Sequence, residues 1–214
     1  MEVTQSLFNR RSIREFDSKP VSRQELEKLF EAAARTPSWA NSQPWEVFVA
    51  QGETLERIRR SFQLKHADNA SLSPEIPLPK KWTDEAKQRQ RHLQPDMVRD
   101  CGDVIDRFKI LNRSLFNAPV VVYICLDRIL SEWSLFDIGA YSQSLMLVAT
   151  QLGLASIPAM MLTVFPEVIR QELHIPDNLK IAIGIAIGYA DESSAINRFV
   201  SSRRTVDETV RFFD

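Results

Sequence analysis

The sequence predicts one domain that combines helices with a central β-sheet. Apolar segments at about residues 46–50, 118–126 and 180–189 are typical of strands, and helical patterns separate them. At 214 residues, the chain is long enough to bury one sizeable core. Alternation of helices and strands leaves open whether the sheet is parallel or antiparallel.

The first elements follow from capping and helical spacing. Ser22-Arg23-Gln24-Glu25 is a capping box, and apolar residues then recur at helical spacing, which predicts a helix over residues 22–35. Pro37 ends that helix. The strand at 46–50 follows, and a second amphipathic helix is expected to begin near Glu53.

The segment at about residues 65–100 departs from this pattern. Three prolines interrupt its first part, and the charged run from Trp82 to His92 is compatible with a helix. We therefore expect a variable surface excursion, which is either a mobile loop or a lid over a pocket.

The second half begins with a helix at 103–111 and a fully buried strand at 118–126. A short helix is expected over 166–173, and the strand at 180–189 is expected to be central. The polar tail from 197 to 214 carries apolar side chains that should dock on another surface, such as a partner subunit.

A helix predicted over residues 134–152 is apolar almost all round, and Gly153 stands where a C-terminal capping glycine is expected. Because such a helix must be covered on several faces, we expect a subunit interface along it. Polar residues and Pro158 interrupt the most apolar region, Leu145 to Leu162, which indicates a buried helix followed by a loop rather than a membrane span.

Composition excludes several partners and compartments. The net charge of -1 provides no general attraction to nucleic acid or to anionic membranes. Residues 1–6 lack the features of a secretory signal, so we expect a cytoplasmic protein. Cys101 and Cys125 have no metal or redox spacing and are expected to be reduced thiols.

Common catalytic motifs are missing from the sequence. His66, His92 and His174 share no metal spacing and belong to no recognisable nucleophile arrangement. No glycine-rich phosphate loop follows a strand, which argues against a Rossmann domain. The remaining possibility is a site for a cofactor that brings its own reactivity.

Two polar stretches are candidates for that site. The Arg turn, Arg10-Arg11-Ser12-Ile13-Arg14, offers guanidiniums and a hydroxyl that can bind a phosphate and polar ring edges. The Trp loop, residues 37–45, combines turn-forming residues with two tryptophans, which indicates an irregular loop against a flat apolar surface. Alternatively, the arginines are only surface charges, and Asn41 with Ser42 only closes a helix-to-strand turn.

An ordered set of motifs carries a family resemblance over nearly the whole chain. It consists of the Arg turn, the Pro-Ser-x-x-Asn-Ser-Gln-Pro-Trp loop, Gly153–Pro158, Gly188–Asp191 and the tail arginine Arg203. Together they resemble the FMN-dependent nitroreductase family. The resemblance implies an α+β fold with a mainly antiparallel sheet flanked by helices, as a single domain over residues 1–214. It also implies an intertwined homodimer whose C-terminal extensions are exchanged.

By this resemblance, Arg10, Arg11 and Ser12 would hold the phosphate and ribityl region of FMN, with Arg203 joining at the phosphate. Arg14 would lie by the pyrimidine edge of the flavin. A cation there stabilises the negative charge of the reduced flavin.

The resemblance further implies that Pro37, Ser38 and Asn41 approach the flavin of the partner subunit. Trp39 would either line the substrate side by stacking or only cover the core.

Residues 158–161 resemble the family segment whose backbone lies along the flavin ring. They are Pro158, Ala159, Met160 and Met161. The Met160 backbone amide would donate toward flavin N5, and no side chain would be catalytic. Met160-Met161 replaces the glycine-containing version of other members, and Met161 alternatively fills irregular core space.

The implied function is reduction of nitroaromatic or quinone-like molecules by a ping-pong mechanism, with NADH or NADPH as hydride donor. The middle segment resembles a nitrobenzoate-reductase-like branch. Reductive dehalogenation, flavin-dependent oxidation and a non-catalytic flavin-binding module are the alternatives.

Overall fold

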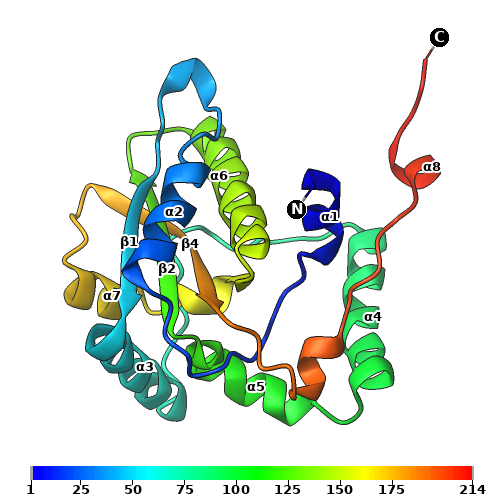
Figure 1. Ribbon diagram of the computed structural model, residues 1–214, viewed down its shortest axis with the longest axis horizontal. Coiled ribbons are helices and arrows are strands. Elements are labelled where there is room, and N and C mark those ends of the chain that lie inside the picture. Colours follow the sequence, from blue (N-terminus) through cyan, green and yellow to red (C-terminus); the bar gives the residue numbers. More distant parts are fainter. Residues whose placement is uncertain (1, 214) are drawn as a thin grey trace.

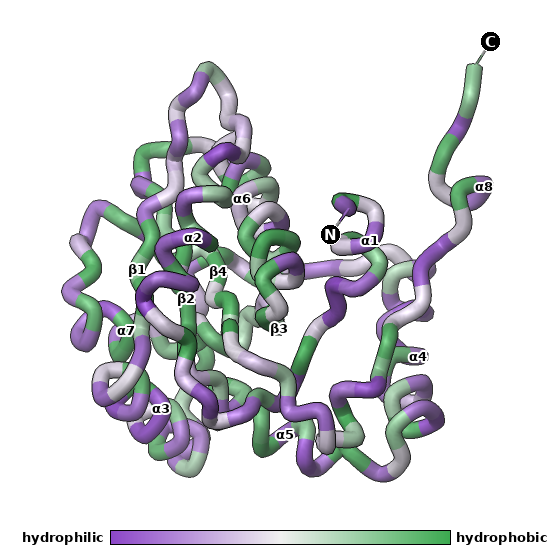
Figure 2. The backbone as a smooth tube through the Cα atoms, in the orientation of Figure 1, coloured by the Kyte–Doolittle hydropathy of each residue, from purple (hydrophilic) through white to green (hydrophobic). Residues whose placement is uncertain are grey.

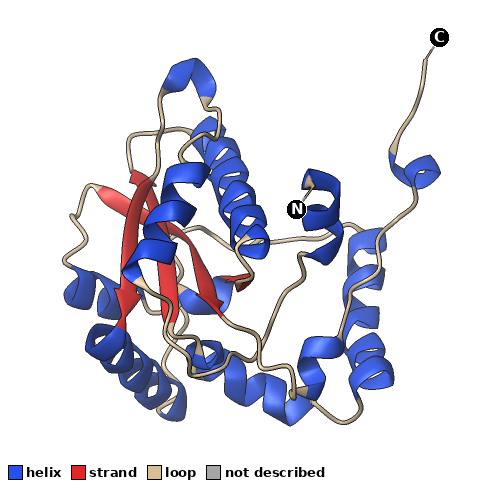
Figure 3. Cartoon of the chain, in the orientation of Figure 1, coloured by secondary structure: helices blue, strands red, loops and turns tan. Residues whose placement is uncertain are grey.

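A four-stranded antiparallel sheet forms the centre of the molecule (Figures 1 and 3). The computed structural model describes residues 2–213, so Met1 and Asp214, the ends of the predicted domain, lie outside the described residues. The strands occur in the order β1-β2-β4-β3. Their bounds are β1 Glu46–Gln51, β2 Val120–Asp127, β3 Ala155–Ala159 and β4 Leu179–Gly188. The structure thus confirms the predicted antiparallel α+β architecture.

Helices cover both faces of this sheet (Figure 1). Their bounds are α1 Val3–Asn9, α2 Arg23–Ala33, α3 Gly52–Ala67, α4 Asp84–Cys101, α5 Ile105–Arg113, α6 Glu132–Gln151, α7 Pro166–Leu173 and α8 Val206–Thr209. In Figure 2 the hydrophobic colour is concentrated in the sheet and α6, whereas outer helices such as α3 carry hydrophilic stretches.

Strand β2 is buried on both faces because its side chains alternate between two cores. Val121 and Tyr123 pack in the core formed with α3, α5 and α7. Val122 and Ile124 pack in the core formed with α2 and α6. A continuous apolar run is what a strand covered by helices on both sides requires.

Local sequence signals explain several boundaries. Ser22 caps α2, with its hydroxyl accepting from Glu25 N (3.2 Å) while the Glu25 carboxylate accepts from Ser22 N (2.8 Å). Gly153 follows α6 with a φ of +77°, the left-handed conformation expected of a capping glycine. Both interpretations of the sequence are confirmed.

Among the elements that were not predicted are one strand and the N-terminal helix. The segment after Gly153, interpreted as a loop, is the edge strand β3, whose neighbouring strand in the sheet is β4. It contains Pro158, so its composition did not indicate a strand. The N-terminal helix α1 was also missed, because of its residues only Ser6 is buried and its sequence has no clear apolar face.

The predicted excursion at 65–100 divides into an irregular part and a helix. Residues 68–83 form no helix or strand, and α4 follows them. Glu75 anchors the irregular part, since its carboxylate accepts from Ile181 N (2.7 Å) and from the Arg170 guanidinium (2.9 and 3.0 Å). The helical run was therefore correctly predicted, although α4 extends beyond His92.

The α6 helix and the tail expose apolar surface. Trp133 and Phe136 on α6 are exposed, as are Phe212 and Phe213 at the end of the tail. The tail with α8 stands away from the body of the chain (Figure 1). Among residues 2–213, no helix is both long and apolar enough to cross a membrane.

Candidate functional site

The Arg turn lies alongside the edge strand β3. Ser12 and Ser156 form a parallel bridge, and Ile13 N donates to the Ser156 carbonyl oxygen (3.1 Å). Further along, Phe16 forms an antiparallel bridge with Ala190, just after β4. The β3–β4 edge of the sheet therefore fixes the path of residues 12–16.

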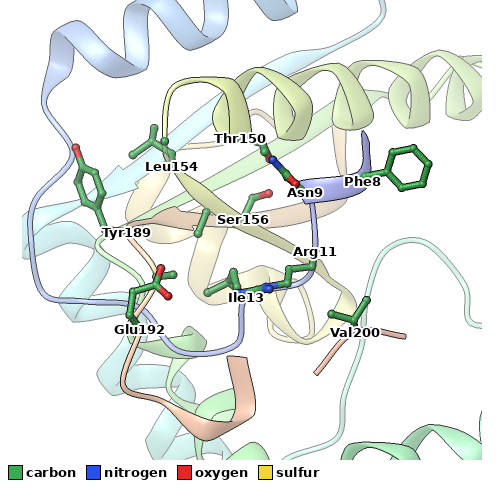
Figure 4. Close-up of a pocket in the computed structure, with 13 residues that line it drawn as sticks. Phe8, Asn9, Arg11, Ile13, Thr150, Leu154, Ser156, Tyr189, Glu192 and Val200 are labelled. Atoms are coloured by element: carbon green, nitrogen blue, oxygen red, sulfur yellow. The ribbon is translucent and has the colours of Figure 1, made fainter. Parts of the chain in front are cut away.

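A cavity of about 590 Å³ opens beside this turn (Figure 4). Its walls come from the end of α1, the Arg turn, the end of α6, β3 and the segment after β4. Residues that line it include Phe8, Arg11, Ser156, Tyr189, Glu192 and Val200. Its volume lies in the range typical of small-molecule and cofactor sites.

Ser156 carries an unpaired hydroxyl in this wall. The residue is 2% exposed, and its Oγ has no hydrogen-bond partner among the residues that the structure describes. In Figure 4 the Ser156 side chain lies between Thr150 and Ile13. A buried hydroxyl without a partner is costly, so this position suits a ligand with a hydrogen-bonding group.

Arg10 and Arg11 begin the Arg turn, and no carboxylate among the described residues forms a salt bridge with either of them. Burial, followed by the nearby positive charge of Arg203, lowers the pKa of Arg10. Within residues 2–213, no carboxylate forms a salt bridge with Arg203 either. Like charges in a partly desolvated place favour binding of an anion.

Arg203 itself lies on the exposed tail. Its guanidinium donates to the Ser201 hydroxyl (2.7 Å) and to the carbonyl oxygens of Ser201 and Ser202. Its positive charge contributes to the lowered pKa of Arg10.

Arg14 is supported by one hydrogen bond and two aromatic rings. Its guanidinium donates to the Ser12 carbonyl oxygen (2.9 Å) and lies 5.3 Å from the ring centroid of Phe199 and 6.0 Å from that of Phe108. Burial lowers the pKa of Arg14, while the neighbouring Cys101 acts in the opposite direction.

The segment expected to follow the flavin ring begins on β3. Pro158 and Ala159 end that strand, and Met160 and Met161 begin the short helix Met160–Leu162. All four are partly buried, and both methionines pack against the core. The bridge between Ser12 and Ser156 places the Arg turn beside β3, the strand that leads into this segment.

The Trp loop lies away from the Arg turn and packs against α6. Trp39 N donates to Asp137 Oδ2 (3.2 Å), and the Trp39 ring lies 6.2 Å from that of Trp133. Pro37, Ser38 and Trp39 line a second cavity of about 500 Å³ together with Phe136 of α6. None of the residues lining the first cavity belongs to this loop.

The Trp loop is also strained and outward-facing. Trp39 is 69% exposed, and Ala40, Asn41 and Gln43 have positive φ values. The Ser38 hydroxyl accepts from Gln43 N (2.9 Å), which closes the loop on itself. The structure thus places the Arg turn beside β3, the strand that leads into residues 158–161, and places residues 37–41 elsewhere, against α6.

Comparison with known proteins decides the family. A family model described as the Nitroreductase family matches residues 7–189. The chain belongs to the Nitroreductase family. It is 32% identical over 197 residues to the 4-nitrobenzoate reductase of Pseudomonas putida, covering 88% of this chain and 86% of that protein. It is 29% identical to the nitroreductase NfnB of Mycolicibacterium smegmatis over 95% of this chain and 89% of that protein.

Solved nitroreductase structures share the fold over the whole length. The crystal structure of the FMN and NADPH-dependent nitroreductase NfnB from sphigopyxis sp. strain HMH matches with a TM-score of 0.90 and 28% identity, covering 100% of both chains. The FMN-dependent NfnB from Mycobacterium smegmatis in complex with NADPH matches with a TM-score of 0.89 and 27% identity, covering 99% of this chain and 98% of that one. The family resemblance found in the sequence is confirmed.

Sequence reasoning did not name every residue that lines the cavity beside the Arg turn. Ser156 stood inside a motif used for the resemblance but was not proposed as a site residue. Its signal was a hydroxyl in an otherwise apolar segment. Phe8 and Val200 had no such signal, because they join the cavity only through the positions of α1 and the tail.

Proposed function

We propose that this protein is an FMN-dependent oxidoreductase that uses NADH or NADPH to reduce nitroaromatic or quinone-like small molecules. Family membership and the activities of the similar nitroreductases support this proposal. The observation that carries the cofactor assignment is the set of un-neutralised arginines beside a cavity with a buried, unpaired hydroxyl.

The residues present fit FMN. Arg10, Arg11 and Arg203 would bind the phosphate, because guanidinium groups form charge-assisted, multi-donor contacts with phosphate oxygens. Ser12 would contact the ribityl region. The unpaired Ser156 hydroxyl would gain a hydrogen bond from the same ligand.

Other residues would orient and tune the ring system. Arg14 would place a cation at the pyrimidine edge, and the backbone of Met160 would donate toward N5. When bound, FMN supplies the ability to accept and release hydride. The chain contributes binding, orientation and electrostatic stabilisation, and we expect a ping-pong mechanism with one pocket for both substrates.

A homodimer would complete this site. Pro37, Trp39 and Asn41 are exposed in the Trp loop beside α6, with Ser38 partly buried among them, which suits contact with the cofactor of a second copy. The exposed apolar side chains of α6 and of the tail support burial against that copy. The chain would act as a single FMN-binding domain, and its two free, buried cysteines suit the reducing cytoplasm.

The direct test is an anaerobic visible spectrum of the purified protein before and after addition of NADH or NADPH. A yellow protein that is bleached by a nucleotide and recovers its colour with 4-nitrobenzoate or nitrobenzene is expected. A protein that neither contains nor binds FMN would overturn the cofactor assignment. A yellow protein that refuses both nucleotides would favour an oxidase or a non-catalytic flavin-binding module. Parallel lines in two-substrate steady-state plots would support the ping-pong mechanism.

A further inference from the structure

The side chain of Asn197 joins the Arg turn to the segment after β4. Asn197 is 4% exposed and lies in the short helix Ala195–Arg198. Its Oδ1 accepts from Arg14 N (2.8 Å) and Glu15 N (3.1 Å). Its Nδ2 donates to the carbonyl oxygens of Glu15 (2.7 Å) and Asp191 (3.0 Å). One amide therefore makes four hydrogen bonds, its full capacity.

These hydrogen bonds fix the backbone of the Arg turn at Arg14 and Glu15. The Glu15 side chain is fixed as well, since its carboxylate pairs with the Arg107 guanidinium and accepts from the Ser194 hydroxyl (2.7 Å). Asn197 thus holds the backbone of residues 14 and 15, and Arg107 and Ser194 hold the Glu15 side chain. Buried networks in which every group is satisfied are rigid and specific.

The far end of Arg14 is positioned by the same segment. Phe199, whose ring centroid is 5.3 Å from the Arg14 guanidinium, follows Asn197 by two residues and is 2% exposed. A shift of the Asn197 region would therefore move both the backbone origin and the aromatic support of this cation. A flexible arginine on a surface turn has no comparable support.

We propose that Asn197 is a positioning residue that sets the redox preference of the bound flavin by fixing Arg14. This inference rests on the proposed function, because it requires FMN to be bound with its pyrimidine edge near Arg14. A cation contributes to this preference only if it is held where negative charge develops, since preorganisation is what makes such a charge effective. Asn197 acts through Arg14 and does not itself touch the cofactor.

The test is a double-mutant cycle with Arg14→Ala, Asn197→Ala and the combined variant. The measured quantity is the ratio of the dissociation constants of oxidised and reduced FMN, obtained from the midpoint potentials of bound and free flavin. Arg14→Ala should lower this ratio by about tenfold, as expected for loss of a charge-assisted contact. Asn197→Ala should lower it by about threefold to tenfold, and the double variant should match Arg14→Ala within about twofold.

Glu75→Ala is the matched control. It removes a partly buried group with several hydrogen bonds at Arg170 and Ile181, near the beginning of β4 and away from the cavity. It should lower the melting temperature and leave the redox ratio unchanged. If Asn197→Ala does not fold, Asn197→Ser, which keeps a donor and an acceptor on a shorter side chain, replaces it in the cycle.

An unchanged redox ratio in Asn197→Ala, with only a lower melting temperature, would reduce Asn197 to a structural role and overturn the inference. Multiplicative losses in the double variant would also overturn it, because they would show action independent of Arg14. If Arg14→Ala leaves the ratio unchanged while FMN stays bound, the inference fails and the cofactor assignment stands. If the unmodified protein binds no FMN, the proposed function fails with it.

Discussion

The Arg turn and the Trp loop contrast in how the rest of the chain supports them. Residues 12–16 bridge to Ser156 and Ala190, and Asn197 holds the backbone at Arg14. The Trp loop donates one backbone hydrogen bond to Asp137 of α6, and its two tryptophan rings pack on rings of the same helix. Its tip closes on itself with left-handed residues. One polar stretch is thus completed within the chain, whereas the other faces outward, as a surface that serves a second copy would.

The largest expected effect is a loss of FMN affinity when an arginine of the Arg turn is removed. Arg10→Ala should weaken FMN binding by about tenfold to a hundredfold, because charge-assisted contacts contribute about 1.5–3 kcal/mol. A fluorescence titration of the apoprotein with FMN measures the change. Arg23→Ala, which removes a solvent-facing guanidinium from α2, is the control and should leave the affinity unchanged. Equal affinities in all three proteins would exclude Arg10 from the phosphate site.

A substitution at Gly188 tests how β4 supports Phe16, two residues after the Arg turn. A Cβ atom at this position would lie 2.6 Å from Pro119 Cδ and 3.0 Å from Phe16 Cδ1, and neither ring can move freely. Gly188→Ala should therefore lower the free energy of unfolding by about 1–3 kcal/mol and weaken FMN binding as Phe16 shifts. Chemical denaturation measures the first effect.

Gly139→Ala on α6 is the matched substitution on the side of the Trp loop. Apart from its two chain neighbours and the backbone of its own helix, no atom of the described chain lies within 4 Å of its added Cβ, and helical alanine is favoured over glycine by about 0.5–1 kcal/mol. A small gain in stability is expected within the isolated chain. A loss would indicate that another molecule covers this face of α6.

Mixing a variant of the Arg turn with a variant of the Trp loop tests whether the two stretches act in the same chain or in different chains. Arg10→Ala and Asn41→Ala should each reduce turnover. If each site combines the Arg turn of one copy with the Trp loop of the other, mixed dimers contain one intact site. Random exchange should then restore about a quarter of the unmodified activity. Two variants that remain as inactive after subunit exchange as they are alone would show that both stretches act within one chain.

The success of the sequence predictions depends on the range of the interactions. The α2 helix, the Gly153 cap and the strands β1, β2 and β4 follow from local spacing, and all were predicted. Strand β3 was missed because it exists through pairing with β4, a contact that its own five residues do not encode.

The same distinction applies to the site. The Arg turn was found because its charge density is visible in the sequence. Its supports were not found, since Asn197 meets Arg14 across 183 positions of the chain. The Ser156 hydroxyl was overlooked for a related reason, because only the fold shows that it is buried without a partner.

The smallest expected effect is a change in FMN affinity that distinguishes two buried hydroxyls, neither of which has a hydrogen-bond partner among the described residues. Both Ser156 Oγ and Tyr123 OH are unpaired among the described residues, but Ser156 lines the cavity whereas Tyr123 lies in the core, where burial raises its pKa. Removing either hydroxyl should leave the stability of the apoprotein unchanged or raise it by up to about 1 kcal/mol. Ser156→Ala should also weaken FMN binding by about threefold to tenfold, the value of one hydrogen bond, whereas Tyr123→Phe should leave it unchanged. Titration of both apoproteins with FMN distinguishes them, and an unaltered affinity in Ser156→Ala would mean that the cofactor does not use this hydroxyl.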